Sequence, residues 1–396
     1  MMDESENENV DPDEPRIIAS YPIHISAADR VMVVSPHPDD ESLATGGLLL
    51  AARAAGAAVR VIFLTNGENN PWAQLRVEGR WPFRAADRAR WARRRRAETI
   101  AALARLGVDD HRAAFLNFPD QGLTDLLLRG DDRASRAIAD EFVRWRPTLI
   151  AMPSPDDAHP DHGSASVMIA FALAGLAVLD RPQRVYRYLV HKGAAAQCAP
   201  WQVLLDPGQR QRKREAILCH QSQLRWRRHQ LLSFARWRES YGTASESGAR
   251  MPGHPVRSAY FAAGALPLEC DVPHRFGIGP TVLRVATFGR TGAPVRLSLV
   301  LPTRSCHVSV RDTVTGRVLG SASCVRDVGI VHIRLTLSAA APVGLCFVKL
   351  ERPAERRLGF FDSAGWRHAP VMWSPVRSGG LRPAVERAPA ELEMAM

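Results

Sequence analysis

The sequence contains few cysteines, very few lysines and no apolar run long enough to cross a membrane. Its six cysteines, at positions 198, 219, 270, 306, 324 and 346, include no CxxC pair, which argues against a disulfide framework and against cysteine-ligated zinc. The longest apolar run, Val167 to Leu179, has 13 residues, whereas a membrane-spanning helix needs about 20. The first fifteen residues are acidic and lack an apolar stretch, unlike a secretory signal. We therefore expect a cytoplasmic protein with free thiols and no transmembrane segment.

Lysine is nearly absent although the chain is strongly basic. The formal net charge is +11, and three of the 52 basic residues are lysines. A positive excess of this size suits nucleic acids, membrane surfaces or anionic substrates. However, no nucleic-acid-binding module accompanies the arginines. We attribute the charge largely to compositional bias and expect no nucleic-acid partner.

The first two thirds of the chain alternate between apolar strands and helices. After a predicted acidic, flexible tail (1–28), we expect strands at 31–35, 59–65, 114–117 and 148–152, separated by helices at 46–55, 83–106 and 134–146. This alternation predicts an α/β domain over 29–262, with a Rossmann-like, mostly parallel sheet and helices on both faces. In such folds, functional sites lie at the carboxyl ends of the strands.

The last third of the chain has a different pattern. Apolar and polar residues alternate over 281–287, 295–301, 306–311, 331–337 and 344–350, which is typical of an antiparallel, sandwich-like unit. We expect a β-rich accessory domain over 263–377 and a flexible tail over 378–396. The sequence leaves its role open between carbohydrate binding and oligomer contacts, so a homo-oligomer is compatible with it.

Two loops that follow predicted strands combine histidine and aspartate with proline. His37-Pro-Asp39-Asp40-Glu41 follows the first strand, and His159-Pro-Asp161-His162 follows the fourth. Either loop alone reads equally well as a helix-capping turn. Together they offer two imidazoles and a carboxylate, a ligand set of catalytic zinc that leaves one position for water. The prolines restrict the loop backbone and thus stiffen the ligands.

Further motifs extend the pattern, and with them the chain resembles the LmbE-like (PIG-L) family of zinc-dependent N-acetylglucosaminyl deacetylases. The resemblance covers about residues 30–240 and excludes the β-rich part. The additional motifs are Thr65-Asn-Gly-Glu68, Arg95-Arg-Ala-Glu98 followed by Leu106-Gly107, Phe115 to Leu123 with Pro119-Asp120, and Lys213 to Gln223 with His220-Gln-Ser-Gln.

The resemblance implies the roles of the loop residues. His37, Asp40 and His162 would hold one Zn²⁺ per chain, although other divalent metals suit the same ligands. Asp39 would act as the general base toward the attacking water. A protonated His159 would stabilise the oxyanion of the tetrahedral intermediate.

Five other residues receive supporting roles, each with an alternative. Asp120, Arg95 and His220 would bind substrate, although a turn aspartate, a solvated helix face and a structural helix residue are their simpler interpretations. Glu41 would orient its loop rather than ligate the metal. Asp161 would fix an imidazole from outside the ligand set, or cap the following helix.

The predicted activity is metal-dependent hydrolysis of the N-acetyl group of an N-acetylglucosamine-type sugar or glycoconjugate, giving a free amine and acetate. The partner would be a small amino-sugar conjugate. The alternative is a catalytically silent carbohydrate- or partner-binding protein on the same fold. The presence of Asp39 beside the predicted ligands favours the enzyme.

Overall fold

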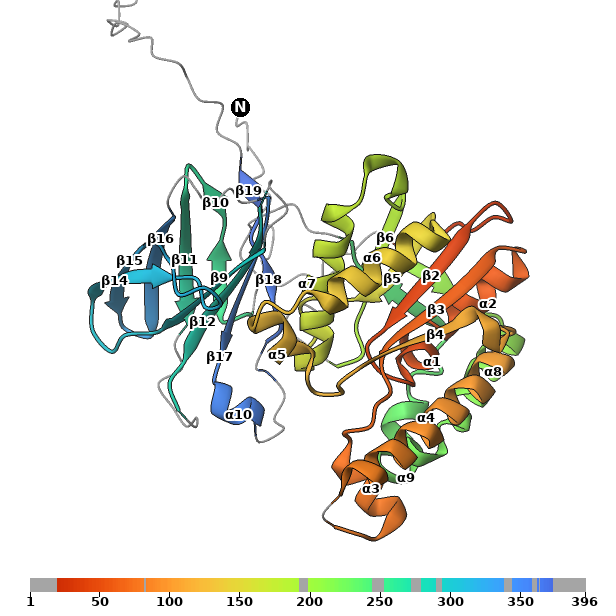
Figure 1. Cartoon of the computed structure of the whole chain (residues 1–396). Helices are drawn as coiled ribbons and strands as arrows, with labels where there is room; N and C mark the ends of the chain where they lie inside the picture. Colours follow the sequence, from red (N-terminus) through yellow and green to blue (C-terminus); the bar gives the residue numbers. More distant parts are fainter. Residues whose placement is uncertain are drawn as a thin grey trace, which may run out of the picture.

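The alternating strands and helices form a five-stranded parallel sheet in the computed structural model (Figure 1). The structure describes residues 20–81, 83–191, 199–243, 253–271, 279–289, 294–337, 344–357, 362 and 364–372. The sheet comprises β2 (Arg30–Ser35), β3 (Ala58–Thr65), β4 (Ala113–Phe118), β5 (Leu149–Pro153) and β6 (Arg184–Tyr188). The order is β4-β3-β2-β5-β6, and all neighbours are parallel. The predicted α/β class is confirmed.

Helices cover both faces of this sheet, also as predicted. The helices are α1 (Asp40–Ala44), α2 (Gly46–Ala54), α3 (Pro71–Glu78), α4 (Ala85–Arg105), α5 (Leu123–Leu128), α6 (Arg133–Trp145), α7 (Pro160–Gly175), α8 (Pro207–Cys219), α9 (Gln221–Leu232) and α10 (Pro353–Arg357), with 3₁₀ turns at Asp110–Arg112 and Val178–Asp180. Alternate side chains of a strand point to opposite faces. Val31 and Val33 therefore pack with α2, α4 and α8, and Met32 and Val34 with α5, α6 and α7.

A small mixed sheet completes the α/β part. It contains β1 (Tyr21–Pro22), β7 (Trp201–Leu204) and β8 (Arg238–Tyr241). Its residues Val203 and Tyr241 belong to the same core as α2 and the parallel sheet. Strands β7 and β8 lie in the C-terminal part of the region that carries the predicted motifs. They therefore pack onto α2, the second helix after the first histidine loop.

The β-rich part forms a two-sheet sandwich, as predicted. Its strands are β9 (Val256–Ala259), β10 (Phe261–Ala262), β11 (Ala265–Asp271), β12 (Val282–Phe288), β13 (Pro294–Val300), β14 (Cys306–Arg311), β15 (Val318–Asp327), β16 (Ile330–Leu337), β17 (Leu345–Glu351), β18 (Arg367–His368) and β19 (Val371–Met372). One sheet has the order β14-β15-β16-β11-β10-β19, with β9 paired to β11, and the other β13-β12-β17-β18. One apolar core, with Leu268 and Ile333 from the first sheet and Val285 and Val348 from the second, fills the space between them.

The sequence-based boundaries of the domains stay predictions. The seven-stranded sheet begins with β9, upstream of the boundary predicted at 262/263. The predicted tails fall largely outside the described residues, which begin at Ser20 and end at Met372. No statement about their structure follows.

The sandwich packs against α5 and α7 of the α/β part (Figure 1). Phe171 of α7 stacks on Phe288 with ring centroids 5.4 Å apart. The buried Arg296 donates from Nε to the carbonyl oxygen of Leu127, at 2.8 Å. Trp366 is fully buried in the core that contains α7. The two parts thus share apolar core as well as polar contacts.

Candidate metal centre

The two histidine loops meet at the carboxyl edge of the parallel sheet. β2 and β5 are neighbours in this sheet, so the loops that leave their ends lie side by side. The first loop leads into α1 and the second into α7. His37 and His162, 125 residues apart in the chain, come together with Nδ1 of His37 3.2 Å from Nε2 of His162.

Asp40 completes a triangle of potential ligand atoms. Its Oδ2 lies 3.5 Å from Nδ1 of His37 and 3.3 Å from Nε2 of His162. Zinc bonds of about 2.0–2.2 Å would place tetrahedral ligands roughly 3.3–3.6 Å apart. The three atoms therefore have the spacing of three corners of a zinc tetrahedron. A divalent ion fits the residues present.

Carboxylates outside the triangle hold both imidazoles by their other nitrogens. Nε2 of His37 is 3.1 Å from Oδ1 of Asp120 and 3.4 Å from Oδ2 of Asp161. Nδ1 of His162 is 3.1 Å from Oδ2 of Asp157. A proton on each outer nitrogen, donated to a carboxylate, leaves the inner nitrogen with its lone pair free to bind a metal.

The electrostatics of this cluster are dominated by buried opposite charges. Burial by itself lowers the pKa of His162, but the Asp40 and Asp157 carboxylates outweigh it and raise the value to about 10. Burial raises the pKa of Asp40, and the two imidazoles hold it well below its usual range instead. The carboxylates thus carry negative charge where a cation would bind.

Asp39 lies next to the ligands in a strained backbone conformation. Its φ angle is +122°, outside the regions that non-glycine residues usually adopt. Nη2 of Arg95 lies 3.1 Å from Oδ2 of Asp39, and Arg95 also donates to the carbonyl oxygens of Gly67 and Pro38. Burial raises the pKa of Asp39 to about 6, although the Arg95 charge opposes the increase.

Arg95 is 4 % exposed, so its interpretation as part of a solvated helix face is wrong. Its guanidinium contacts the chain itself, and its predicted role in substrate binding stays a prediction. Gly67 makes this arrangement possible, because it has a φ of +64° and a Cβ there would overlap the Arg95 guanidinium. The Thr65-to-Glu68 motif and the Arg95 motif therefore contact each other, and Arg95 in turn pairs with Asp39.

Glu41 and His220 form a buried pair on the other side of Asp39. Oε2 of Glu41 accepts from the backbone N–H of Asp39 at 2.9 Å. Its Oε1 accepts from the Ser42 hydroxyl at 2.7 Å and lies 3.2 Å from Nε2 of His220. Glu41 thereby contacts the loop backbone and not the ligand triangle. His220 is 1 % exposed, and its predicted role toward substrate is not tested by these contacts.

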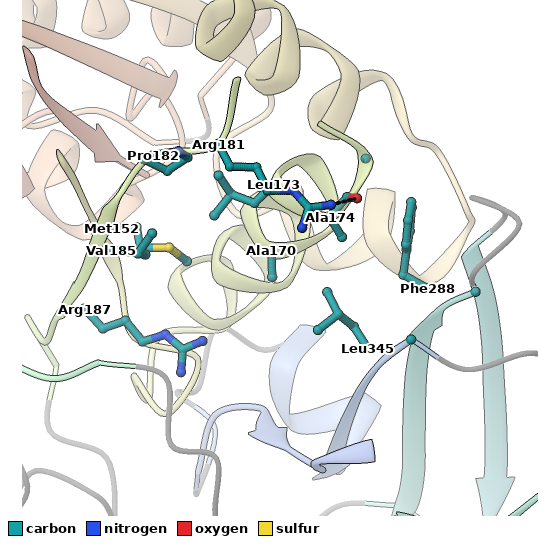
Figure 2. A pocket seen from close by; sticks show the side chains of 13 residues that line it. Met152, Ala170, Leu173, Ala174, Arg181, Pro182, Val185, Arg187, Phe288 and Leu345 are labelled. Atoms are coloured by element: carbon teal, nitrogen blue, oxygen red, sulfur yellow. Dashed lines mark hydrogen bonds between the residues drawn. The ribbon is translucent and has the colours of Figure 1, made fainter. Parts of the chain in front are cut away.

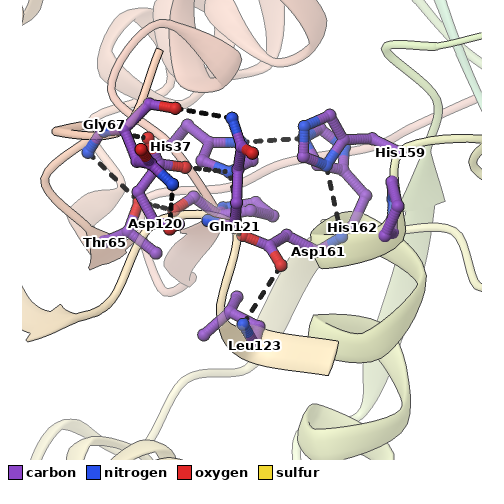
Figure 3. Close-up of polar contacts among 12 residues, drawn as sticks. His37, Thr65, Gly67, Asp120, Gln121, Leu123, His159, Asp161 and His162 are labelled. Atoms are coloured by element: carbon purple, nitrogen blue, oxygen red, sulfur yellow. Dashed lines mark hydrogen bonds and ion pairs between the residues drawn. The ribbon is translucent and has the colours of Figure 1, made fainter. Parts of the chain in front are cut away.

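The surroundings of His159 oppose protonation of its ring, and its predicted role toward the oxyanion stays a prediction. Burial lowers its pKa well below the usual value, and the positive charges of His37, His162 and His191 lower it further. Its Nδ1 accepts from the backbone N–H of Asp161 at 3.2 Å (Figure 3). The neutral ring therefore carries its proton on Nε2, where it is still a hydrogen-bond donor.

Asp120 and Asp161 tie a third loop to the centre. Asp120 is buried and accepts from the backbone N–H of Asn69 at 2.7 Å, in addition to its contact with His37. Asp161 accepts from the N–H groups of Gln121 and Leu123, at 2.7 and 3.1 Å (Figure 3). The carboxylate of Asp120 thus supports an imidazole in the structure, and its predicted contact with sugar hydroxyls stays a prediction.

Sequence reasoning missed Asp157 and His191. Asp157 is fully buried and accepts from the backbone N–H groups of His159, Val190 and His191 at 2.9–3.1 Å. The His191 ring lies 4.9 Å from that of His162. The two consecutive aspartates, Asp156 and Asp157, stand just before His159 in the sequence and could have indicated that Asp157 belongs to the site. His191 follows β6, a strand that the sequence did not reveal.

Three groups of side chains place their possible ligand atoms within 4.8 Å of one another among the described residues. They are His37, His159 and His162; Asp157, His162 and His191; and His37, Asp120 and Asp161. The last two groups use the outer side of a ring, where carboxylates already hold it. The inner nitrogens face each other and Asp40, which favours a metal position between His37, Asp40 and His162.

The fold and this centre define an α/β protein with a His/Asp site at the carboxyl edge of its sheet, and the comparisons show which family this part of the chain resembles. Residues 32–173 match the family model described as PIG-L: GlcNAc-PI de-N-acetylase. The resemblance to the LmbE-like (PIG-L) family is thereby confirmed over this segment.

Curated relatives are similar over the same part of the chain. A 1D-myo-inositol 2-acetamido-2-deoxy-alpha-D-glucopyranoside deacetylase of a Mycobacterium species is 35 % identical over 160 residues, 36 % of this chain and 49 % of the relative. A deacetylase of the same description from Catenulispora acidiphila is 32 % identical over 162 residues, 37 % of this chain and 52 % of the relative. The chain thus spans about half the length of the curated relatives it matches.

Among solved structures, the N,N'-diacetylchitobiose deacetylase from Pyrococcus horikoshii is 19 % identical, with a TM-score of 0.42, over 54 % of this chain and 83 % of that one. A deacetylase from the teicoplanin biosynthetic pathway is 23 % identical, with a TM-score of 0.41, over 55 % of this chain and 100 % of that one.

In the described part of the chain, no helix has the length and apolarity required to cross a membrane.

Proposed function

We propose that this chain is a metal-dependent N-deacetylase that converts an N-acetylglucosamine-type sugar or glycoconjugate to the free amine and acetate. The observation that carries the proposal is the triangle of His37 Nδ1, Asp40 Oδ2 and His162 Nε2, with edges of 3.2–3.5 Å and with Asp39 next to it in sequence. The family match over residues 32–173 supports the same chemistry.

His37, Asp40 and His162 would hold the metal. Two imidazoles and one carboxylate suit Zn²⁺, and the same donors accept iron, cobalt or nickel. When bound, the ion would supply Lewis-acid polarisation of the amide carbonyl and of the attacking water. Asp120, Asp161 and Asp157 would keep the two rings oriented through their outer nitrogens.

Asp39 would accept a proton from water as the water oxygen attacks the amide carbon. It would then give that proton to the departing nitrogen. Its ion pair with Arg95 fixes the carboxylate. His159 would donate a hydrogen bond from Nε2 to the developing oxyanion, because its Nδ1 is used as an acceptor. The net reaction consumes one water and yields amine and acetate.

The names of the relatives suggest the first substrate to test. The Mycobacterium and Catenulispora proteins are described as acting on 1D-myo-inositol 2-acetamido-2-deoxy-alpha-D-glucopyranoside, an N-acetylglucosamine-type conjugate. We propose a substrate of this class without committing to the group attached to the sugar. The scattered cysteines, of which the five described ones are free, support the proposed cytoplasmic location.

Acetate release tests the proposal. The protein would be incubated with the inositol conjugate, N-acetylglucosamine and N,N'-diacetylchitobiose, with and without a chelator. We expect release that stops with the chelator and returns when zinc is restored. Asp39→Asn should retain metal but lose about a hundredfold or more in turnover, whereas the exposed Asp109→Asn should be unchanged. Sugar binding without acetate release from any substrate would favour the silent binding protein.

A further inference from the structure

A cavity lies between the α/β part and the sandwich (Figure 2). It has a volume of about 730 Å³, within the range of small-molecule sites. Its wall is mainly apolar, with Met152 and Val185 from β5 and β6, Leu173 from α7, and Phe288 and Leu345 from the sandwich. Ala174 on its wall is twelve residues beyond His162 on α7, or about 18 Å along the helix.

One charged side chain enters this apolar cavity with a nitrogen that has no hydrogen bond. Arg187 of β6 extends into the space below α7 (Figure 2). The side chain is half-buried, and its Nε is buried and has no hydrogen-bond partner among the described residues. A buried donor without an acceptor is costly, so such a group is normally paired.

The surrounding charges leave a net positive site. Asp156 is the carboxylate that acts on Arg187 through space, and it acts on Arg367 as well. The other arginine of the cavity, Arg181, already donates to the carbonyl oxygens of Leu176 and Ala174, at 3.2 and 3.0 Å. Arg187 thus remains available for one additional negative charge.

We propose that this cavity binds an amphipathic carboxylate, such as a fatty acid, with the carboxylate on Arg187 and the alkyl chain along the apolar wall. A single guanidinium pairs with a carboxylate through two parallel hydrogen bonds. The alkyl chain would cover Leu173, Phe288 and Leu345, gaining the free energy of burying apolar surface.

Calorimetric titration of the full-length protein with decanoate tests this site. We expect decanoate to bind at least tenfold more tightly than 1-decanol, which lacks the charge, than acetate, which lacks the chain, and than inorganic phosphate. Equal binding of 1-decanol would mean that Arg187 recognises no anion, and equal binding of acetate or phosphate would mean that the apolar wall is not used. Either result, or no decanoate binding, overturns the proposal.

Variants of residues that line the cavity test whether decanoate binds there. Arg187→Gln should weaken decanoate about tenfold or more, since a hydrogen-bonded charge is lost. Arg181→Gln is the matched control and should leave binding unchanged, because its guanidinium is already occupied by helix carbonyls. Ala174→Phe, which adds a ring to the cavity wall, should also abolish binding while thermal unfolding shows a folded protein. Unchanged affinity in both Arg187→Gln and Ala174→Phe would place decanoate elsewhere and refute the assignment.

Discussion

At the scale of single residues, the candidate metal centre contains carboxylates outside the proposed ligand triangle as well as Asp40 within it. Asp157 is an example, because its Oδ2 accepts from the backbone N–H groups of Val190 and His191 while it lies 3.1 Å from Nδ1 of His162. One buried carboxylate thereby fixes both the tautomer of the ring and the loop after β6. Removing such an outer partner typically weakens metal binding by 10–100-fold.

Asp157→Asn should therefore bind zinc about 10–100-fold more weakly than the parent protein. The amide has one acceptor oxygen, so it cannot accept at both carboxylate positions, Oδ1 from the backbone N–H of His159 and Oδ2 from those of Val190 and His191. Competition with a fluorescent chelator measures the affinity. Asp109→Asn, an exposed aspartate outside the centre, is the control. An Asp157→Asn protein with parental zinc affinity would show that Asp157 does not position His162.

At the scale of elements, the sequence predicted the strands whose side chains are buried on both faces. β2, β3 and β5 are nearly continuous apolar runs, and the two histidine loops follow β2 and β5, so the sequence indicated that these loops lie close together. β6 was not predicted, because Arg184-Val-Tyr-Arg-Tyr188 at the edge of the sheet contains two arginines and no continuous apolar run. β15 was missed because its Gly, Ser and Ala residues give a weak strand signal.

The contacts that link distant elements also lay beyond sequence reasoning. Arg95 is one of four consecutive arginines, and only the packing of α4 distinguishes it as the one that pairs with Asp39. In the same way, Lys213 and Glu239 come from α8 and β8, and their buried ion pair of 2.5 Å requires the tertiary fold. Glu239 also accepts from the N–H groups of Gly47 and Leu48 at the beginning of α2, where a negative charge is favourable.

Glu239→Gln should lower the free energy of unfolding by about 3–5 kcal/mol, because Lys213 would remain buried without its counter-charge. Urea unfolding followed by circular dichroism provides the value. Glu215→Gln on α8, where the carboxylate accepts from the Gln211 side chain at 2.9 Å, should cost less than 1 kcal/mol. A loss for Glu239→Gln no larger than this control would contradict a structural role for the pair.

At the scale of the whole molecule, the sandwich supports the loop that carries His159. The backbone N–H of Trp366 donates to the carbonyl oxygen of Pro155 at 2.6 Å, and that of Asp362 donates to Ala158 at 3.0 Å. Gly365 lies so close that a Cβ would overlap the carbonyl oxygens of Pro155 and Asp157. The C-terminal part of the chain therefore contacts the backbone on which the second half of the metal centre is built.

Gly365→Ala should displace the 155–159 loop and weaken zinc binding about tenfold, since small misplacements of ligands and their supports are costly. The affinity is measured by the same chelator competition, with thermal unfolding to show that the sandwich persists. Gly175→Ala is the control, because its added Cβ meets no atom nearer than 3.9 Å. If Gly365→Ala binds zinc as the parent does, the sandwich does not support the centre.

Acid should destabilise the junction between the two parts through His254. This buried ring accepts from the backbone N–H of Val256 at 3.0 Å and lies 3.4 Å from the carbonyl oxygen of Gly365. Burial, with the Arg367 charge, lowers its pKa to about 4, whereas the unfolded value is about 6.5. The unfolded chain thus binds the proton more readily. The resulting stability is fully present above about pH 6.5 and is lost as the pH falls toward 4.

His254→Gln keeps both hydrogen-bonding directions but does not titrate. The difference in unfolding free energy between the parent and this variant should therefore change by about 3 kcal/mol between pH 7 and pH 4, in the direction that disfavours the parent in acid. Urea unfolding at several pH values measures it. A difference that is constant with pH would contradict neutral burial of His254.

The most direct test of the central claim is an anomalous difference map, recorded at the zinc edge from crystals grown with zinc. We predict one peak per chain at about 2.0–2.2 Å from Nδ1 of His37, a carboxylate oxygen of Asp40 and Nε2 of His162. A peak among Asp157, His162 and His191, or among His37, Asp120 and Asp161, with none inside the triangle, would contradict the assigned metal centre and the mechanism built on it.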